Sequence, residues 1–231
     1  MNIALIGYGK MGRSLEKIAL DQGHSIVACI TSTDWDEEAI LQADVCLEFT
    51  RPECVVDNVQ RLSALNKQII IGTTGWLDKL DVVQRLVQEH QIGALYSPNF
   101  SIGIYLFLHI VANASSLTKA FPEYDVAGFE LHHKEKKDAP SGTAKDIAKV
   151  IQEHGKLDHP VPFSSVRCGK IPGTHTVLFD SFCDTISITH EARNREGFAQ
   201  GAIQAAQWIQ GKKGFYTFAD CMQEIISRRS L

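Results

Sequence analysis

Short apolar runs alternate with amphipathic segments through the first hundred residues, and this alternation constrains the fold more than any other feature of the sequence. The apolar runs are bounded by glycine or polar residues, as buried strands of a parallel sheet are. Strands that alternate with helices build a doubly wound parallel sheet, so we predict an N-terminal α/β domain. Its expected strands are residues 2–6, 25–30, 44–49, 68–71 and, as the last, 93–96; its expected helices are 11–23, 52–65 and 78–90.

The pattern changes after residue 101. A long apolar segment at residues 102–120 predicts a helix, and the later runs alternate apolar and polar residues, as half-buried strands do. We predict an α+β domain here, with a mixed or antiparallel sheet and helices on one face. The expected strands are residues 125–133, 161–168, 175–181 and 185–192, with a helix at 142–154. Two further helices, at 198–210 and 218–227, close the chain.

Composition and charge exclude several kinds of partner. The 231 residues carry 23 basic and 27 acidic side chains, and the net charge of −4 offers no field that would attract nucleic acid or an anionic membrane. The longest apolar stretch is too short to span a bilayer, and the N-terminus shows no secretion signal. None of the six cysteines forms a C-x-x-C pair, so we expect reduced thiols, no metal site and a cytoplasmic location.

A glycine-rich turn at residues 7–12 matches the G-x-G-x-x-G pattern between the first expected strand and helix. Gly7 permits a tight turn, Gly9 lets a pyrophosphate approach the backbone, and Gly12 allows helix and strand to pack closely. The amides at the helix start then bind the anion. We therefore predict a Rossmann-like dinucleotide site. Its contacts would be Gly7, Tyr8, Gly9, Lys10, Met11 and Gly12.

The residue that would bind the 2′-position of the adenosine ribose is ambiguous. An acid is expected at the end of the second strand, but this strand ends with hydroxyl residues at 31–33, and the first acid is Asp34. Asp34 reaching a 2′-hydroxyl would favour NADH. The hydroxyls, with charge from Lys10 or Arg13, would instead favour NADPH. Both coenzymes stay open at this point, with a slight preference for NADPH.

Two further segments follow expected strands, where open α/β sheets bind ligands. Residues 72–75, Gly-Thr-Thr-Gly, suit the nicotinamide–ribose half of a dinucleotide, although an ordinary strand-to-helix loop explains them equally well. Residues 97–100, Ser-Pro-Asn-Phe, are a similar case. The candidate cofactor contacts here are Gly72, Thr73, Thr74, Ser97, Pro98, Asn99 and Phe100.

A dense group of charged and imidazole side chains occupies residues 130–144. Imidazole titrates near neutral pH and suits general acid catalysis. His132, His133 and Lys136 are therefore candidate proton donors. The alternative interpretation is a solvated charged loop, which is what most charge runs are.

A helix start adjoins this group. Ser141 is the expected N-cap, and the helix begins at Gly142. The amides of Gly142 and Thr143, helped by the hydroxyls of Ser141 and Thr143, would bind a carboxylate at the positive end of the helix. The helix start favours a binding site over a solvated loop.

The pattern Glu-x-His-His-x-x-Lys-x-Asp-Ala-Pro-Ser-Gly-Thr-Ala at residues 130–144 resembles the signature of the 4-hydroxy-tetrahydrodipicolinate reductase family. The resemblance runs the length of the chain. It includes the glycine-rich turn and residues 48–50, Glu-Phe-Thr, where the family usually has Asp-Phe-Thr. It continues through residues 72–75, 97–103, Arg167-x-Gly169, Gly173-x-His175 and 195–202.

The resemblance implies NAD(P)H-dependent reduction of 4-hydroxy-tetrahydrodipicolinate to tetrahydrodipicolinate, with loss of water, in lysine and diaminopimelate biosynthesis. It implies His132 as proton donor and acceptor and Lys136 as a second proton donor. A carboxylate of the small dicarboxylate substrate would lie against the helix start. The implied substrate-binding residues are His133, Ser141, Gly142, Thr143 and, less directly, Arg195.

Domain organisation follows from the same resemblance. Residues 1–101 and 199–231 would bind the dinucleotide, and residues 102–198 would bind substrate and join subunits into a homotetramer. Two other functions compete with this one. A non-catalytic nucleotide sensor explains the glycine-rich turn but not the clustered imidazoles, and a different small-acid dehydrogenase would act on free amino acids rather than on the cyclic imine.

Overall fold

The computed structural model describes residues 1–31, 35–194 and 196–229. The chain forms two compact units, one of Met1–Ile102 with Glu196–Leu231 and the other of Gly103–Arg195. Each unit has its own sheet and its own apolar core. In the described parts of the chain, no helix is long and apolar enough to cross a membrane.

Six parallel strands form the sheet of the first unit, in the order β10-β5-β4-β3-β1-β2. The central strands are mostly apolar because helices cover both faces, and Ile3, Val45 and Ile70 are fully buried. The predicted doubly wound parallel sheet is confirmed. Its strands are β1 (Asn2–Ile6), β2 (Ser25–Ile30), β3 (Val45–Glu48), β4 (Gln68–Ile71), β5 (Gly93–Tyr96) and β10 (Gly214–Thr217).

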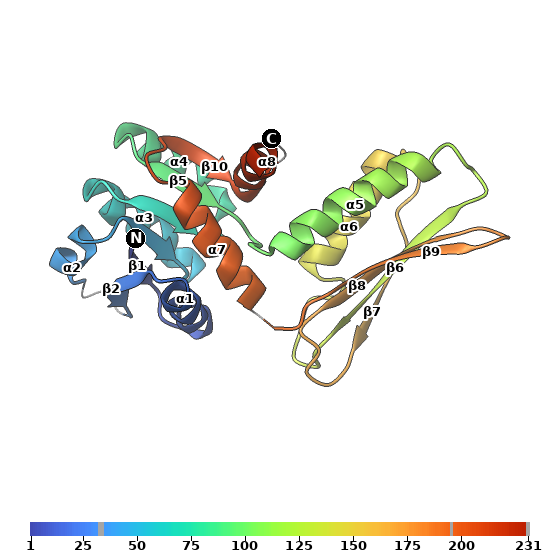
Figure 1. Ribbon diagram of the computed structural model, residues 1–231, viewed down its shortest axis with the longest axis horizontal. Helices are drawn as coiled ribbons and strands as arrows, with labels where there is room; N and C mark the ends of the chain where they lie inside the picture. Colours follow the sequence, from blue (N-terminus) through green and yellow to red (C-terminus); the bar gives the residue numbers. More distant parts are fainter. Residues whose placement is uncertain (32–34, 195, 230–231) are drawn as a thin grey trace. The chain divides into compact units, whose positions relative to one another are not determined.

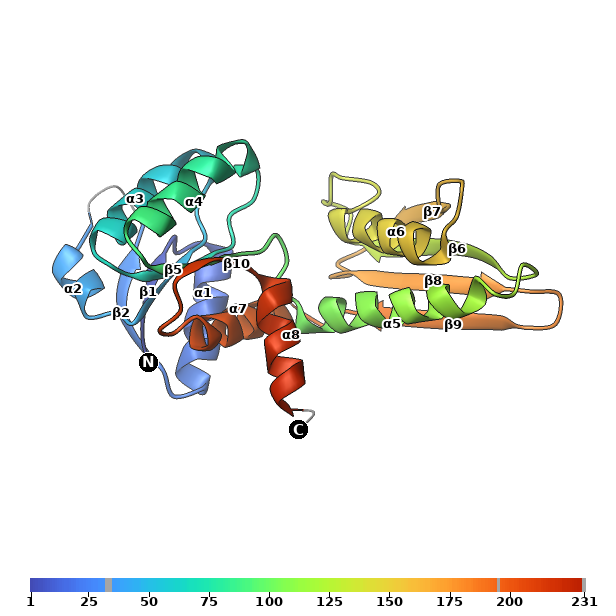
Figure 2. The same ribbon diagram turned by 90° about the horizontal axis from the view of Figure 1, so that it is seen from above.

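Helices pack on both faces of this sheet (Figure 2). Helices α3 and α4 pack together on one face, and α1 and α7 pack together on the other. Apolar residues recur at steps of three and four, as at Leu15, Ile18 and Ala19 of α1, which are buried. The helices are α1 (Lys10–Asp21), α2 (Glu37–Leu41), α3 (Val55–Ala64), α4 (Leu80–Glu89), α7 (Glu196–Trp208) and α8 (Phe218–Arg229).

The expectation that residues 93–96 form the last strand of this sheet is wrong, because β10 pairs with β5 in parallel. The four residues Gly-Phe-Tyr-Thr between two helices are too few to show a strand period. The short helix α2 is also missing from the prediction. Asp36 caps it, accepting a hydrogen bond from the amide of Ala39 at 3.0 Å.

The second unit has a four-stranded mixed sheet, and its helices α5 and α6 lie on one face of it (Figure 1). Strand β6 pairs in parallel with β7 and antiparallel with β8, which pairs antiparallel with β9. The predicted α+β arrangement is confirmed. Val126, Val177 and Phe179 of the sheet pack against Ile147 and Ile151 of a helix. The elements are α5 (Ile102–Thr118), β6 (Asp125–His132), α6 (Gly142–Gly155), β7 (Phe163–Arg167), β8 (Thr174–Asp180) and β9 (Thr185–Glu191).

Strand β6 places two polar side chains inside this unit. Its residues alternate between buried and less buried, and Val126, Gly128, Glu130 and His132 form the buried set. Because successive side chains of a strand point to opposite faces, Glu130 and His132 lie on the same face as the core residue Val126. The strand thus carries a carboxylate and an imidazole into the interior near its end.

Candidate active site

Three neighbouring strands bring polar side chains to one place on the covered face of the second sheet. The strand register pairs Glu130 on β6 with Ser165 on β7 and with His175 on β8. Two residues further along β6, His132 pairs with Arg167. Paired residues on the same face of a sheet are neighbours. Segments far apart in the sequence therefore meet at the end of β6.

The Glu130 carboxylate is fully buried and is held by three donors. Its Oε1 accepts hydrogen bonds from the Ser141 amide at 3.0 Å, the Ser165 hydroxyl at 2.7 Å and the Arg167 guanidinium at 2.9 Å. Burial opposes ionisation, but these hydrogen bonds outweigh it and lower the pKa of Glu130 to about 2. The carboxylate is therefore charged at neutral pH.

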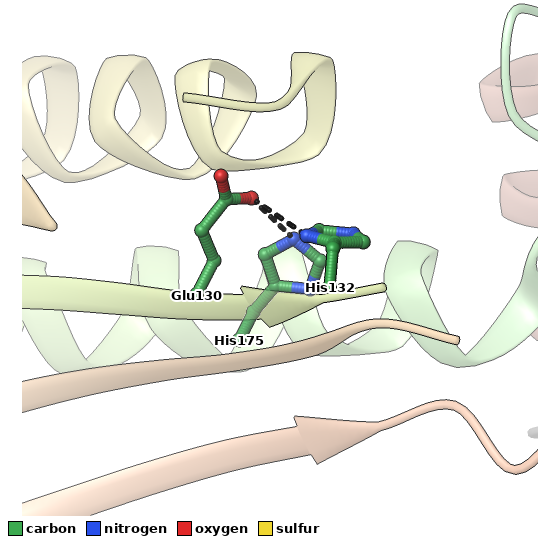
Figure 3. Close-up of side chains that lie close together, drawn as sticks. All are labelled: Glu130, His132 and His175. Atoms are coloured by element: carbon green, nitrogen blue, oxygen red, sulfur yellow. Dashed lines mark ion pairs between the residues drawn. The ribbon is translucent and has the colours of Figure 1, made fainter. Parts of the chain in front are cut away.

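The other oxygen of Glu130 faces two imidazole rings (Figure 3). Oε2 lies 3.2 Å from Nδ1 of His132 and 3.5 Å from Nε2 of His175. The two rings meet edge to face, with centroids 5.2 Å apart. Burial lowers the pKa of both rings, to about 4 for His175. Both imidazoles are therefore mainly neutral at pH 7.

Lys136 lies in the loop after β6. Its backbone amide donates a hydrogen bond to the carbonyl of the half-buried His133 at 3.1 Å, and its ammonium group pairs with Asp138 at 2.7 Å. The charge of Lys136 is close enough to His132 to contribute to the lowered pKa of that ring. The structure thus brings two of the three candidate proton donors, His132 and Lys136, into one electrostatic neighbourhood.

Helix α6 begins beside this cluster. The Ser141 hydroxyl accepts a hydrogen bond from the Ala144 amide at 3.1 Å, which confirms the predicted N-cap, and lies 3.3 Å from Nε2 of His175. Gly142 is exposed, and no described atom lies within 4 Å of the place where a Cβ would sit. The space beside Gly142 is therefore open at the positive end of the helix, where hydrogen bonds from Lys136 and from the Gly142 amide lower the pKa of the Asp138 carboxyl.

Glu130, His132 and His175 also offer ligand atoms within 4.8 Å of one another, and carboxylate and imidazole are groups that bind metals. Charge argues against this use. The Arg167 guanidinium already lies 2.9 Å from the same carboxylate, and the Lys136 cation adds positive charge nearby. We interpret the cluster as a hydrogen-bonded site for proton transfer.

The glycine-rich turn of the first unit has the shape that a dinucleotide requires. Gly7 has a φ of +97°, and a Cβ there would lie 2.1 Å from the Phe49 carbonyl oxygen. At Gly9 no described atom comes within 4 Å of a Cβ position, so the backbone can be approached. Gly9 is the N-cap of α1, and no described side chain caps the first amides of that helix. These features fit a bound pyrophosphate.

A cavity of about 510 Å³ adjoins this turn at the carboxyl ends of β1 and β2. Gly7, Gly9 and Thr31 line it with Trp35, and the Arg61 guanidinium lies 5.3 Å from the Trp35 ring centroid. Our sequence reasoning missed Trp35 and Arg61 because both lie outside the glycine motif.

Predicted contacts after β4 and β5 have defined local roles. Gly72, Thr73 and Thr74 line a cavity of about 280 Å³ together with Met11. The Thr73 hydroxyl accepts a hydrogen bond from the Thr50 amide at 2.7 Å. After β5, the Ser97 hydroxyl donates to the Asn99 carbonyl at 2.7 Å, Pro98 is exposed, and Phe100 packs against Phe49 and Phe218.

The remaining predicted residues are Tyr8, Lys10, Asp34 and Arg195. The Tyr8 hydroxyl donates to Glu16, and Lys10 is exposed at the start of α1. Asp34 and Arg195 lie outside the described residues, so their predicted contacts stay predictions.

Sequence reasoning assigned no role to Glu130, Ser165, Arg167 or His175. The two-residue spacing of Glu130 with His132, and of Ser165 with Arg167, was a signal that each pair shares a face of its strand. The strand register decides that the two pairs meet, and spacing along the chain does not reveal it.

Both units match models of one protein family. Residues 1–100 match the model described as dihydrodipicolinate reductase, N-terminus, and residues 103–222 match dihydrodipicolinate reductase, C-terminus. The 4-hydroxy-tetrahydrodipicolinate reductase of Christiangramia forsetii is 32% identical over 97% of this chain and 99% of its own length. That of Neisseria gonorrhoeae is 34% identical over 90% of this chain and 83% of its own length.

A solved structure shares the fold. The dipicolinate-bound dihydrodipicolinate reductase of Paenisporosarcina sp. TG-14 superposes with a TM-score of 0.80 at 24% identity, covering 95% of this chain and 98% of that chain. The family models cover nearly the whole sequence, and the relatives exceed 30% identity over most of their length. The chain therefore belongs to the dihydrodipicolinate reductase family.

Proposed function

We propose that this chain reduces 4-hydroxy-tetrahydrodipicolinate to tetrahydrodipicolinate in lysine and diaminopimelate biosynthesis. In the balanced reaction, one NAD(P)H and one proton are consumed, and one NAD(P)⁺ and one water are released. The observation that carries the proposal is the buried cluster around His132, which lies beside the positive end of helix α6. A proton-transfer group next to an anion site suits a carboxylate substrate that must gain a proton.

In this proposal, different residues of the second unit transfer protons and bind the substrate. His132 and Lys136 exchange protons with the substrate and with the departing hydroxyl group. The amides of Gly142 and Thr143, with the Ser141 hydroxyl, bind a substrate carboxylate, and His133 and Arg195 are further substrate contacts. A bound dicarboxylate would favour the protonated form of His132, because a nearby negative charge raises an imidazole pKa.

The first unit holds the coenzyme in this proposal, and the bound coenzyme supplies the hydride. The first amides of α1 and the turn at residues 7–12 bind the pyrophosphate, and residues 72–74 and 97–100 contact the nicotinamide half. Thr31, Arg51 and Arg61 line the cavity at the carboxyl ends of β1 and β2. A hydroxyl and two guanidinium groups suit a 2′-phosphate, which supports NADPH as the preferred coenzyme.

The reaction and the coenzyme can be tested in one assay. We expect the purified protein to oxidise NADPH when dihydrodipicolinate synthase and its substrates are present, and to leave NADPH intact when the synthase is omitted. Parallel runs should give a higher kcat/KM for NADPH than for NADH. The reverse order would contradict the coenzyme preference alone. No oxidation of either coenzyme would contradict the reaction, and turnover of free amino acids instead would indicate a different dehydrogenase.

We also propose a homotetramer assembled through the second unit. The sheet there has helices on one face only, Val166 is 48% exposed, and the hairpin residue Phe182 is fully exposed. Exposed apolar side chains on an uncovered sheet support a subunit contact. Sedimentation should give a mass four times the 25.6 kDa of one chain, and Val166→Glu should lower it. A wild-type monomer would contradict this assembly.

A further inference from the structure

The proposed function uses His132 but leaves the buried carboxylate beside it unexplained. Oε1 of Glu130 already accepts three hydrogen bonds, so its capacity is used on that side. Oε2 instead faces the rings of His132 and His175 (Figure 3). Within the described residues, neither Oε2 nor Nδ1 of His132 has a hydrogen-bond partner, and the two atoms lie 3.2 Å apart. The contact between Oε2 and Nδ1 of His132 is the shorter of the two that Oε2 makes with the imidazole rings.

The distance between Oε2 of Glu130 and Nδ1 of His132 indicates which nitrogen of the His132 ring carries the proton. Neutral imidazole has one N–H and one bare acceptor nitrogen. A bare Nδ1 would face the carboxylate oxygen at 3.2 Å, which sets two acceptors against each other. A protonated Nδ1 turns the same contact into a charge-assisted attraction in a buried place. The geometry favours the tautomer with its hydrogen on Nδ1.

That tautomer leaves Nε2 as the atom that exchanges protons. A Cβ at position 173 would lie 3.0 Å from Nε2 of His132, and Gly173 has a φ of +155°. Glycine at this position therefore keeps space open beside Nε2. A side chain there would crowd the edge of the ring that a substrate must reach.

We propose that Glu130 is a positioning residue for His132: its charge faces Nδ1 and holds the hydrogen of the neutral ring there, so that Nε2 is the proton-exchanging atom. The inference rests on the proposed role of His132. Glu130 itself takes up no proton, since its pKa of about 2 keeps it ionised. Its charge stabilises the imidazolium form when Nε2 accepts a proton. The ring thus stays in one orientation through both halves of a proton transfer.

Other charges also act on His132, and they set the sign of a pH test. Burial, Lys136 and Arg167 lower the pKa of the ring, whereas Glu130 and Asp138 raise it. Removing the charge of Glu130 must therefore lower the pKa of His132 further. On the sheet, the titratable and charged groups around the ring are Glu130 on the same strand, Arg167 on β7, His175 on β8 and, beyond it, His190 on β9. In the loop after β6 they are Lys136 and Asp138.

The wild-type protein gives the first test, which needs no variant to fold. In ¹⁵N NMR of protein labelled at histidine, the His132 ring should show a protonated Nδ1 and a bare Nε2 at neutral pH. A His132→Gln sample identifies the signal by its loss. A ring protonated mainly on Nε2 would overturn the proposal.

The second test compares Glu130→Gln with Ser165→Ala. The first variant removes the charge that faces Nδ1, whereas the second removes only a donor to Oε1. We expect Glu130→Gln to mix the two tautomers, lower the His132 pKa and reduce kcat by about 10–100-fold, as for other groups that orient an imidazole. Ser165→Ala should leave the tautomer as in wild type and change kcat by only a few-fold.

The outcomes separate this inference from the proposed function. If wild type reduces the imine but Glu130→Gln folds with an unchanged tautomer and His132 pKa, the positioning role is wrong while the reaction stands. If no preparation reduces the imine, the reaction is wrong, and the NMR result still decides whether Glu130 orients the ring. A purely structural role would lower the yield of folded protein without moving the tautomer.

Discussion

Replacing His132 or Lys136 by alanine is expected to lower turnover by about 10²–10⁴-fold each, the usual contribution of a positioned proton-transfer group. Steady-state kinetics of the coupled reduction should show the loss mainly in kcat. The physical reason is that no other described donor lies in the same place. His175 is close, but its pKa of about 4 leaves it neutral, and Nε2 of its ring already faces Glu130 and Ser141.

Matched control variants distinguish the loss of a particular proton donor from the general loss of a lysine or histidine side chain. Lys134→Ala and His159→Ala remove the same side-chain types from exposed positions. Both should retain near-normal kcat, because Lys134 and His159 have no part in the proposed chemistry. Normal turnover in both His132→Ala and Lys136→Ala would refute their assigned roles. A loss as large in Lys134→Ala would show that the field of the loop matters more than a particular donor.

Arg167→Met is expected to lower the free energy of unfolding by about 3–5 kcal/mol, the cost of leaving a buried charge without its partner. Arg167 donates to Glu130 at 2.9 Å and to the Asp138 carbonyl at 2.6 Å, with its side chain 18% exposed and that of Glu130 fully buried. Methionine keeps much of the volume but no charge. The loss should be measured as a lower midpoint of urea unfolding, followed by hydrogen exchange in β6.

The same substitution at Arg228 is the control. Arg228 pairs with Glu224 on the surface, where its side chain is 72% exposed. Exposed ion pairs contribute about 0–1 kcal/mol, so Arg228→Met should barely move the midpoint. Equal effects of the two substitutions would mean that the Glu130–Arg167 pair is not the buried anchor described above.

Much of the architecture could be predicted because it is local. The strands at Ser25–Ile30, Gln68–Ile71 and Gly93–Tyr96 are bounded as expected, since each is a short apolar run between helical patterns. β10 could not be predicted, because its four residues carry no period and its place beside β5 depends on tertiary pairing. The local sequence pattern determines whether a segment forms a helix or a strand, whereas tertiary packing determines which strand it pairs with.

The residues of the candidate site also fall into two groups, those that local sequence reveals and those that only strand pairing brings together. His132, Lys136 and the Ser141 cap lie within one short segment, so residue type and spacing were enough to single them out. Arg167 and His175 lie about forty residues downstream, and only the pairing of β7 and β8 with β6 brings them to Glu130. The contacts that tune the chemistry are therefore the ones that spacing could not reveal.

The alternation of buried and less buried side chains along β6 limits where residues can be inserted into this chain or deleted from it. Glu130 and His132 share a face only because one residue separates them. Inserting a single residue upstream within β6 would turn both side chains to the opposite face, away from Ser165, Arg167 and His175. Length changes are thus tolerable at the turns, such as that between β8 and β9, whereas in β6 a shift of one position would dismantle the site even if every residue of it were kept.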